Sequence, residues 1–185
     1  KIKINNNTIK LIKYYKLINY NLIYNNQAIN RYKNNTFEIP ENKAKNLDKL
    51  KNSITNIKNC ELKKSATNIV FSDGNPDAKI MLIGEGPGAN EDQEGLPFVG
   101  RAGTLLDKML ASISLDRKNV YITNVVNYRP PENRSPTDEE IKRYLPLVNK
   151  HIEIIDPKIL VLLGSTAMNA LLGNENVISK VRGKW

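Results

Sequence analysis

Residues 79–88 decide the fold of this chain and read Lys-Ile-Met-Leu-Ile-Gly-Glu-Gly-Pro-Gly. The apolar half, residues 79–83, has the length and composition of a buried strand, and the half that follows is a loop rich in glycine and proline. Residues 97–103, Pro-Phe-Val-Gly-Arg-Ala-Gly, come shortly afterwards and lead into a helical pattern. A glycine-rich loop at the carboxyl end of a strand, with an aromatic side chain held nearby, is typical of an α/β pocket for a flat ring.

Outward from this stretch, strand-like and helix-like segments alternate. Strands are predicted at residues 79–83, 120–126 and 159–163, and helices at residues 102–113, at 137–155 and after 164. This alternation predicts an α/β protein, a three-layer α/β/α sandwich with a short parallel central sheet. The loops 84–103, 123–134 and 164–169 begin at the carboxyl ends of the three strands, so we expect them to form one site.

The helix predicted at residues 137–155 has residues that typically mark where a helix begins and ends. Thr137 and Glu140 have the spacing of a capping box, and Pro157 ends the helical pattern. Pro146 lies inside the pattern and predicts a kink or a break.

The N-terminal part of the chain is strongly basic. Residues 1–64 contain 14 Lys and Arg against 4 Asp and Glu, whereas residues 65–185 contain 14 against 15. We predict an Asn- and Lys-rich helical extension and linker over residues 1–57, with helices near 8–22 and 47–58, and a second domain over residues 58–185. The basic excess either contacts phosphates or reflects a composition rich in Asn, Lys, Ile and Tyr.

Length and cysteine content limit the class of protein. A chain of 185 residues is long enough for one core. Its single cysteine, Cys60, excludes an internal disulfide and favours a reducing, cytoplasmic location. No apolar run approaches the roughly 20 residues that span a bilayer, so we expect no membrane association, and we expect a monomer.

Six motifs follow one another in an order that resembles the family 4 uracil-DNA glycosylases. They are Gly-Glu-Gly-Pro-Gly at 84–88, Glu-Asp at 91–92, the run 97–103, Thr-Asn-Val-Val at 123–126, Arg-Pro-Pro-Glu-Asn-Arg at 129–134, and Leu-Gly at 163–164. The resemblance covers roughly residues 58 to 185. It implies the glycosylase fold and an enzyme of base excision repair that flips uracil out of single- or double-stranded DNA and hydrolyses its N-glycosidic bond.

Uracil recognition needs a flat apolar surface and a side chain that reads the ring edge. Phe98 is the candidate surface for stacking, with core packing as the alternative. Asn124 is the candidate reader, because its amide offers a donor and an acceptor that match O4 and N3–H of uracil. The alternative for Asn124 is a role in the turn that follows its strand.

The resemblance also implies two catalytic positions. Glu85 would position or activate the water that captures the sugar cation, unless it is an exposed loop acid. Gly86 would bring a backbone N–H close to uracil O2, where negative charge grows. Glu91 and Asp92 match an acidic pair of the family, and a solvated loop edge is their alternative.

DNA-facing residues are expected on two further loops. Arg129, Pro130 and Arg134 lie in the stiff segment that resembles the DNA-facing segment of the family. Ser165, with Thr166, begins the third helix and would either bind a phosphate or cap the helix. His151 lies far from every motif along the chain, and we expect it at the surface.

The chain departs from the family at the iron–sulfur ligands. Members hold a [4Fe–4S] cluster with four cysteines, and at the four corresponding positions this chain has Cys60, Lys63, Tyr128 and Tyr144. One thiolate and two phenols do not hold such a cluster. We therefore expect no metal and no cofactor, and aromatic packing in place of the cluster.

The second departure is at the carboxyl end. Residues 182–185, Arg-Gly-Lys-Trp, match a turn after which family members continue into a fourth strand and a His-Pro segment. We expect this strand to be missing here, which leaves a catalytically impaired remnant that binds DNA or uracil as the alternative to an active glycosylase. A nucleotide-binding domain is the weakest alternative, because the 84–88 loop lacks the G-x-G-x-x-G spacing.

Overall fold

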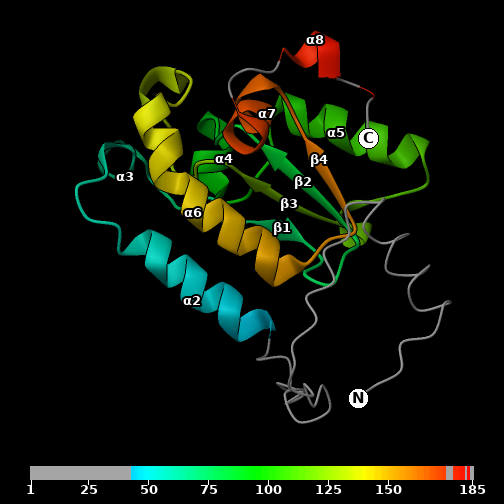
Figure 1. Ribbon diagram of the computed structural model, residues 1–185, viewed down its shortest axis with the longest axis horizontal. Helices are drawn as coiled ribbons and strands as arrows, with labels where there is room; N and C mark the ends of the chain where they lie inside the picture. The colour runs from blue at the N-terminus through cyan, green and yellow to red at the C-terminus, as the bar shows by residue number, and fades with distance from the viewer. Residues whose placement is uncertain (1–42, 174–176, 182, 184–185) are drawn as a thin grey trace, which may run out of the picture. The chain divides into compact units, whose positions relative to one another are not determined.

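The computed structural model describes residues 43–173, 177–181 and 183 (Figure 1). Its elements in chain order are α2 (Lys43–Thr55), α3 (Glu61–Ser65), β1 (Asp73–Gly74), β2 (Ile80–Gly84), α4 (Ala89–Glu94), α5 (Arg101–Ser112), η1 (Arg117–Asn119), β3 (Val120–Asn124), η2 (Pro131–Asn133), α6 (Asp138–Ile155), β4 (Ile159–Leu162), α7 (Ser165–Leu172) and α8 (Ile178–Val181). The helix predicted near residues 8–22 lies outside the described residues. Within the described ranges, no helix is both long and apolar enough to cross a bilayer.

The sheet has the strand order β1-β3-β2-β4. β2 pairs in parallel with both β3 and β4, which confirms the predicted parallel centre, and the two-residue β1 adds an antiparallel edge. The register pairs Gly84 with Asn124 and Ile83 with Leu162. The three parallel strands therefore end at the same level, and the loops that follow them begin side by side.

Helices cover both faces of the sheet, as predicted for a three-layer sandwich. Met81 and Ile83 point to one face and share a cluster with residues of α2, α6 and α7, whereas Leu82 points to the other face and packs against Leu106 and Leu110 of α5. This division follows from the strand geometry, since successive side chains point to opposite faces. Figure 1 shows α6 crossing in front of the strands.

Helix α2 belongs to this core. Leu47, Leu50 and Ile54 are buried on one side of it, at the i, i+3 and i+7 spacing of a helical stripe, and they lie in the same cluster as Val148 and Ile155 of α6. The compact unit that contains them spans residues 40–185. It therefore starts before the boundary predicted between residues 57 and 58, because α2 has an apolar face that only this core covers.

Helix α6 begins as the capping pattern predicts. The backbone N–H of Glu140 donates to Thr137 Oγ1 at 3.2 Å, and the N–H of Thr137 donates to Glu140 Oε2 at 2.7 Å. Of the kink or break predicted at Pro146, the break does not occur, since the helix continues through this residue to Ile155. Pro146 lies on the exposed side of the helix, where the loss of one backbone N–H is least costly.

His151 is buried, which corrects its expected place at the surface. Its ring is 3% exposed and stacks on Phe71, with centroids 4.7 Å apart, while Nε2 lies 2.8 Å from the hydroxyl of Tyr121. Burial lowers the pKa of His151 to about 4. The helical period explains the position, because Tyr144, Val148 and Ile155 are the other buried residues of α6.

Candidate functional site

A cavity of about 350 Å³ opens where the loops after β2 and β3 meet. It is lined by Gly86, Gly88, Ala89, Asn90, Glu91, Phe98, Gly100, Arg101, Ala102 and Asn124. Residues from four of the six motif segments thus meet at the carboxyl ends of two parallel strands. This is where open α/β sheets bind their ligands.

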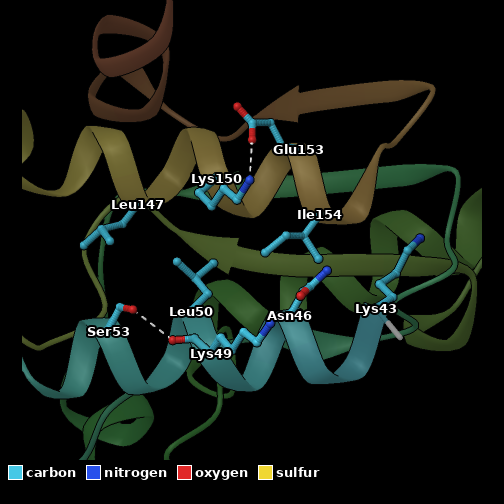
Figure 2. Close-up of a pocket in the computed structure, with 9 residues that line it drawn as sticks. All are labelled: Lys43, Asn46, Lys49, Leu50, Ser53, Leu147, Lys150, Glu153 and Ile154. Atoms are coloured by element: carbon cyan, nitrogen blue, oxygen red, sulfur yellow. Dashed lines mark hydrogen bonds and ion pairs between the residues drawn. The ribbon is translucent and has the colours of Figure 1, made fainter. Parts of the chain in front are cut away.

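A larger cavity, about 700 Å³, lies between α2 and α6 (Figure 2). No motif residue lines it, and its polar side chains already have partners within the protein. Lys43 donates to the carbonyls of Pro76 and Ile155, each at 3.1 Å, and Lys150 pairs with Glu153 at 2.9 Å. The smaller cavity is therefore the candidate site.

Gly84 allows the aromatic ring and the amide to approach each other. A Cβ atom built on this residue would lie 2.5 Å from Asn124 Oδ1 and 2.5 Å from Phe98 Cζ. Any side chain at position 84 would displace one of the two groups. The glycine at the end of β2 thus has a specific role, which is to leave room for Phe98 and Asn124 on either side of it.

Asn124 lines this cavity and has a side-chain amide whose oxygen is buried. The side chain is 3% exposed, and its Oδ1 has no hydrogen-bond partner among the described residues. Buried polar groups normally have partners, and leaving one without a partner costs about 1–3 kcal/mol. The Asn124 amide is therefore a candidate group for binding a ligand in this cavity.

The backbone of Phe98 is fixed in an unusual conformation. Its φ of +57° lies in the left-handed region, which few residues other than glycine adopt. Arg117 donates to the carbonyl oxygen of Pro97 at 3.1 Å and also to that of Phe98. On the other side, Gly103 has no side chain where the Phe98 carbonyl packs against α5.

Arg117 is a site-supporting residue that the sequence analysis missed. It pairs with Asp73 of β1 at 2.7 Å and with Asp107 of α5 at 2.8 Å, and its side chain is 24% exposed. Burial alone would lower the pKa of Arg117, but the bonds to Asp107 and Asp73 raise it. The guanidinium therefore ties the Phe98 loop to both the sheet and α5.

Glu85 and Gly86 lie directly after β2. The Glu85 side chain is half-buried, and its Oε2 accepts a hydrogen bond from the hydroxyl of Thr166 on α7, so it is not a freely exposed loop acid. Gly86 lines the cavity and packs on Val126, and a Cβ atom there would lie 2.7 Å from a methyl group of Val126. Glu85 itself does not line the cavity but lies beside it.

Glu91 and Asp92 hold the loops together. Glu91 accepts hydrogen bonds from the backbone N–H groups of Gly88, Val99 and Gly100 at 2.8–3.1 Å, and so joins the first loop to the aromatic loop. Asp92 is buried and accepts from the N–H groups of residues 67 and 68. The alternative of a solvated loop edge is therefore wrong for Asp92.

The residues expected to face DNA differ in whether their side chains are exposed and whether they already bind another residue of the protein. Arg134 forms a two-point ion pair with Glu140, at 2.7 and 2.8 Å, which lowers the pKa of Glu140. Arg129 donates to Asn133 at 2.8 Å. Ser165 is exposed and makes no capping bond at the start of α7. Pro130 is buried in its loop.

Arg101 was also missed by the sequence analysis. It begins α5, is exposed, and lines the cavity that contains Phe98 and Asn124. Among the described residues it makes no ion pair. The only signal for it in the sequence is its place inside the aromatic motif at 97–103.

Three of the four positions that correspond to iron–sulfur ligands come together. Cys60 Sγ lies 3.5 Å from the hydroxyl of Tyr144, both are buried, and Tyr128 is 5% exposed in the same cluster. Burial, followed by the contact with Cys60, raises the pKa of Tyr144. Lys63 instead points outward and donates to the carbonyl of Thr55.

This donor set does not fit a [4Fe–4S] cluster. Such a cluster is held by four thiolates, and here the space between α3 and α6 contains one thiol and two phenol rings. The residues that replace the ligands pack against one another instead.

Comparisons with known proteins agree with this geometry. The family model described as the uracil DNA glycosylase superfamily matches residues 71–185, and a model of a domain of unknown function matches residues 15–90. The chain is 46% identical, over 75% of its length, to a type-4 uracil-DNA glycosylase of Sulfurisphaera tokodaii, of which it covers 65%.

Two further type-4 uracil-DNA glycosylases are similarly close. The chain is 47% identical over 67% of its length to that of Thermotoga maritima, covering 65% of it, and 44% identical over 75% of its length to that of Archaeoglobus fulgidus, covering 71% of it. The chain thus spans about two thirds of the length of these relatives. The family model and the extent of these identities show that the chain belongs to the uracil-DNA glycosylase superfamily, in its type-4 family.

Proposed function

We propose that this chain recognises uracil in DNA and hydrolyses its N-glycosidic bond, a step of base excision repair. The observation that carries the proposal is the unsatisfied Oδ1 of Asn124, buried in a cavity of about 350 Å³ beside the ring of Phe98. The names of the relatives support the same reaction.

Uracil recognition follows from the chemistry of these two side chains. A flipped base that stacks on Phe98 presents its edge to Asn124, whose Oδ1 accepts from N3–H while Nδ2 donates to O4. Cytosine has no N3–H and carries an amino group in place of O4. It would therefore leave the buried oxygen unpaired in this amide orientation, which penalises the wrong base.

The bond-breaking step assigns roles to Glu85 and Gly86. As the bond between C1′ and N1 breaks, its electron pair leaves with uracil, and the backbone N–H of Gly86 stabilises the charge that grows on O2. Water adds to C1′, and the Glu85 carboxylate takes its proton. The base lies inside the cavity and the sugar outside it, so a carboxylate beside the cavity suits this role.

DNA binding outside the cavity is proposed for Arg101, Arg129 and Ser165, whereas the buried Pro130 is proposed to stiffen its loop. Arg101 is exposed at the cavity and has no ion pair among the described residues, so it is available to a phosphate next to the flipped nucleotide. Arg134 is proposed to stabilise its loop through Glu140, with a weaker role in DNA contact. We propose that the chain acts as a monomer in a reducing, cytoplasmic compartment, on single- or double-stranded DNA.

We further propose that the chain works without an iron–sulfur cluster. The proposal is supported by Lys63, Tyr128 and Tyr144 at three of the four ligand positions, and by the packing of both phenols around Cys60. The purified protein is expected to be colourless, without absorbance near 400 nm. About four iron atoms per chain after anaerobic purification would contradict this.

Binding without turnover is the second candidate function. The observation that favours it is the position of His151, the single histidine of the chain, which is buried against Tyr121 on the other side of the sheet core from α5. His151 therefore does not reach the cavity and does not assist departure of the base. Loss of one such donor typically costs roughly 10²–10³ in rate.

One experiment separates the two candidates. A fluorescent oligonucleotide with a single uracil, in single- and double-stranded form, is mixed with excess protein, and binding and abasic sites are measured together. An active glycosylase is expected to bind the DNA and to leave abasic sites, whereas a protein that binds without turnover is expected to bind the DNA and leave none. Asn124→Asp is the matched control for recognition, since it changes one atom of the reading group. Equal affinity for DNA with uracil and DNA with cytosine at the probed position, in the unaltered chain and in this variant, would refute the proposed site.

A further inference from the structure

The loops that carry Glu85 and Thr166 are neighbours because of the sheet register. β2 and β4 pair in parallel, Ile83 lies opposite Leu162, and the N–H of Leu163 donates to the carbonyl of Ile83 at 2.8 Å. Residue 85 therefore leaves the sheet next to the start of α7. Eighty-one residues separate the two side chains in sequence, and the sheet alone brings them together.

The hydroxyl of Thr166 is directed at this carboxylate. Thr166 is the second residue of α7, and its Oγ1 donates to Glu85 Oε2, with both side chains half-buried. The helix is preceded by Gly164, which has no side chain to cap it, and its first turn contains no acidic residue. The carboxylate of Glu85 thus supplies the negative charge that the start of a helix favours.

We infer that Thr166 is a positioning residue for Glu85, an inference that rests on the function proposed above. A glutamate side chain has three rotatable bonds, and a water molecule is placed for attack only when the carboxylate is held in one orientation. The hydroxyl of Thr166 fixes one carboxylate oxygen and leaves the other free to accept a proton from water. The role expected for Thr166 as a phosphate ligand is thereby replaced, because its hydroxyl already has a partner.

The test compares Thr166→Val, which removes the hydroxyl at nearly constant shape, with Thr166→Ser, which keeps it. Thr104→Val is the matched control, because the Thr104 hydroxyl is exposed and bonds only to Gly100 in its own helix. Single-turnover excision is expected to fall about 10–100-fold in Thr166→Val, the range for loss of a hydrogen bond to a charged group, and to recover in Thr166→Ser. Affinity for uracil DNA is expected to stay the same in all three variants.

Coupling to Glu85 distinguishes positioning from a general structural effect. In a Glu85→Gln background, Thr166→Val is expected to cause little further loss, because the two changes remove the same interaction. Additive losses, or weaker DNA binding in Thr166→Val, would overturn the inference.

A measurement without turnover keeps this result separate from the proposed function. In protein with ¹³C-labelled glutamate, the Glu85 carboxyl resonance is expected to coincide in the unaltered chain and Thr166→Ser and to be displaced in Thr166→Val. A resonance that does not move refutes the contact. If the resonance moves but the unaltered chain excises no uracil, the proposed function fails, and the role in positioning fails with it.

Discussion

Lowering the pH from 7 to 4.5 is expected to destabilise the folded chain through His151. The pKa of this buried ring is about 4 in the folded chain, because burial disfavours its charged form, and about 6.5 in an unfolded chain. Between these values the unfolded state binds a proton that the folded state does not. Stability is therefore complete above pH 6.5 and is lost as the pH falls toward 4.

The size of the effect follows from the same two values. The gap corresponds to about 3 kcal/mol in total, of which about 2 kcal/mol is lost between pH 7 and pH 4.5. The carboxylates take up protons, and so affect the free energy of unfolding, mainly at lower pH than the histidine. Glu140, for example, has its pKa lowered chiefly by the hydrogen bond from Arg134, so its contribution is lost only below pH 4.5. The change in the free energy of unfolding between pH 7 and pH 4.5 therefore reports mainly on His151.

The assay is urea unfolding followed by far-ultraviolet circular dichroism at several pH values in this window. His151→Phe keeps an aromatic ring against Phe71 but removes one of the two partners of the Tyr121 hydroxyl, the other being Ser72, so the double variant with Tyr121→Phe is added as a second reference. Its free energy of unfolding is expected to be flat between pH 7 and 4.5. An equally steep pH dependence in the double variant and the unaltered chain would refute the reasoning.

Three further changes test other parts of the structure. Gly84→Ala is expected to reduce affinity for uracil DNA more than about tenfold, measured by fluorescence anisotropy, because its Cβ atom would displace the flanking amide or ring; unchanged affinity would place the site elsewhere. Arg117→Gln is expected to lower the free energy of unfolding in urea by about 1–3 kcal/mol. Arg117→Lys is expected to restore only part of this loss, since a lysine lacks the planar fork that reaches two carboxylates and the Phe98 carbonyl. Tyr144→Phe, which removes the partner of Cys60, is expected to cost about 1 kcal/mol in urea unfolding, and no loss at all would mean that the contact does not stabilise the chain.

Local patterns in the sequence predicted the framework well. The strands predicted at 79–83, 120–126 and 159–163 are observed at Ile80–Gly84, Val120–Asn124 and Ile159–Leu162. The capping box at Thr137 sets the start of α6. These features depend on residues close together in sequence, where apolar periodicity and capping preferences act directly.

Contacts between distant residues could not be predicted in this way. The antiparallel strand β1 has two residues, too few for any periodic pattern. Arg117 holds the aromatic loop from a position 19 residues away and reaches Asp73 over 44 residues, so only the folded sheet shows its role. The burial of His151 is different, because its helical spacing from Tyr144 and Val148 was present in the sequence.

The sequence predicted which loops form the candidate site, and the structure shows which contacts bring their side chains together. Phe98 and Asn124 were expected to share a pocket, and they line the same cavity. The glycine that lets them approach and the unsatisfied amide oxygen were not predictable, since both depend on distances between β2, β3 and the aromatic loop. Their roles in binding uracil remain predictions.

The bonds from Arg117 to the Phe98 loop also bear on the thermodynamics of recognition. A loop that is ordered only when its ligand arrives loses conformational entropy at that moment, at about 1–2 kcal/mol for each residue fixed. Here the guanidinium of Arg117 holds the left-handed backbone of Phe98 through contacts within the protein itself. The entropy of this loop is therefore lost during folding, and we expect a ligand that stacks on Phe98 to bind without a further cost for ordering the loop.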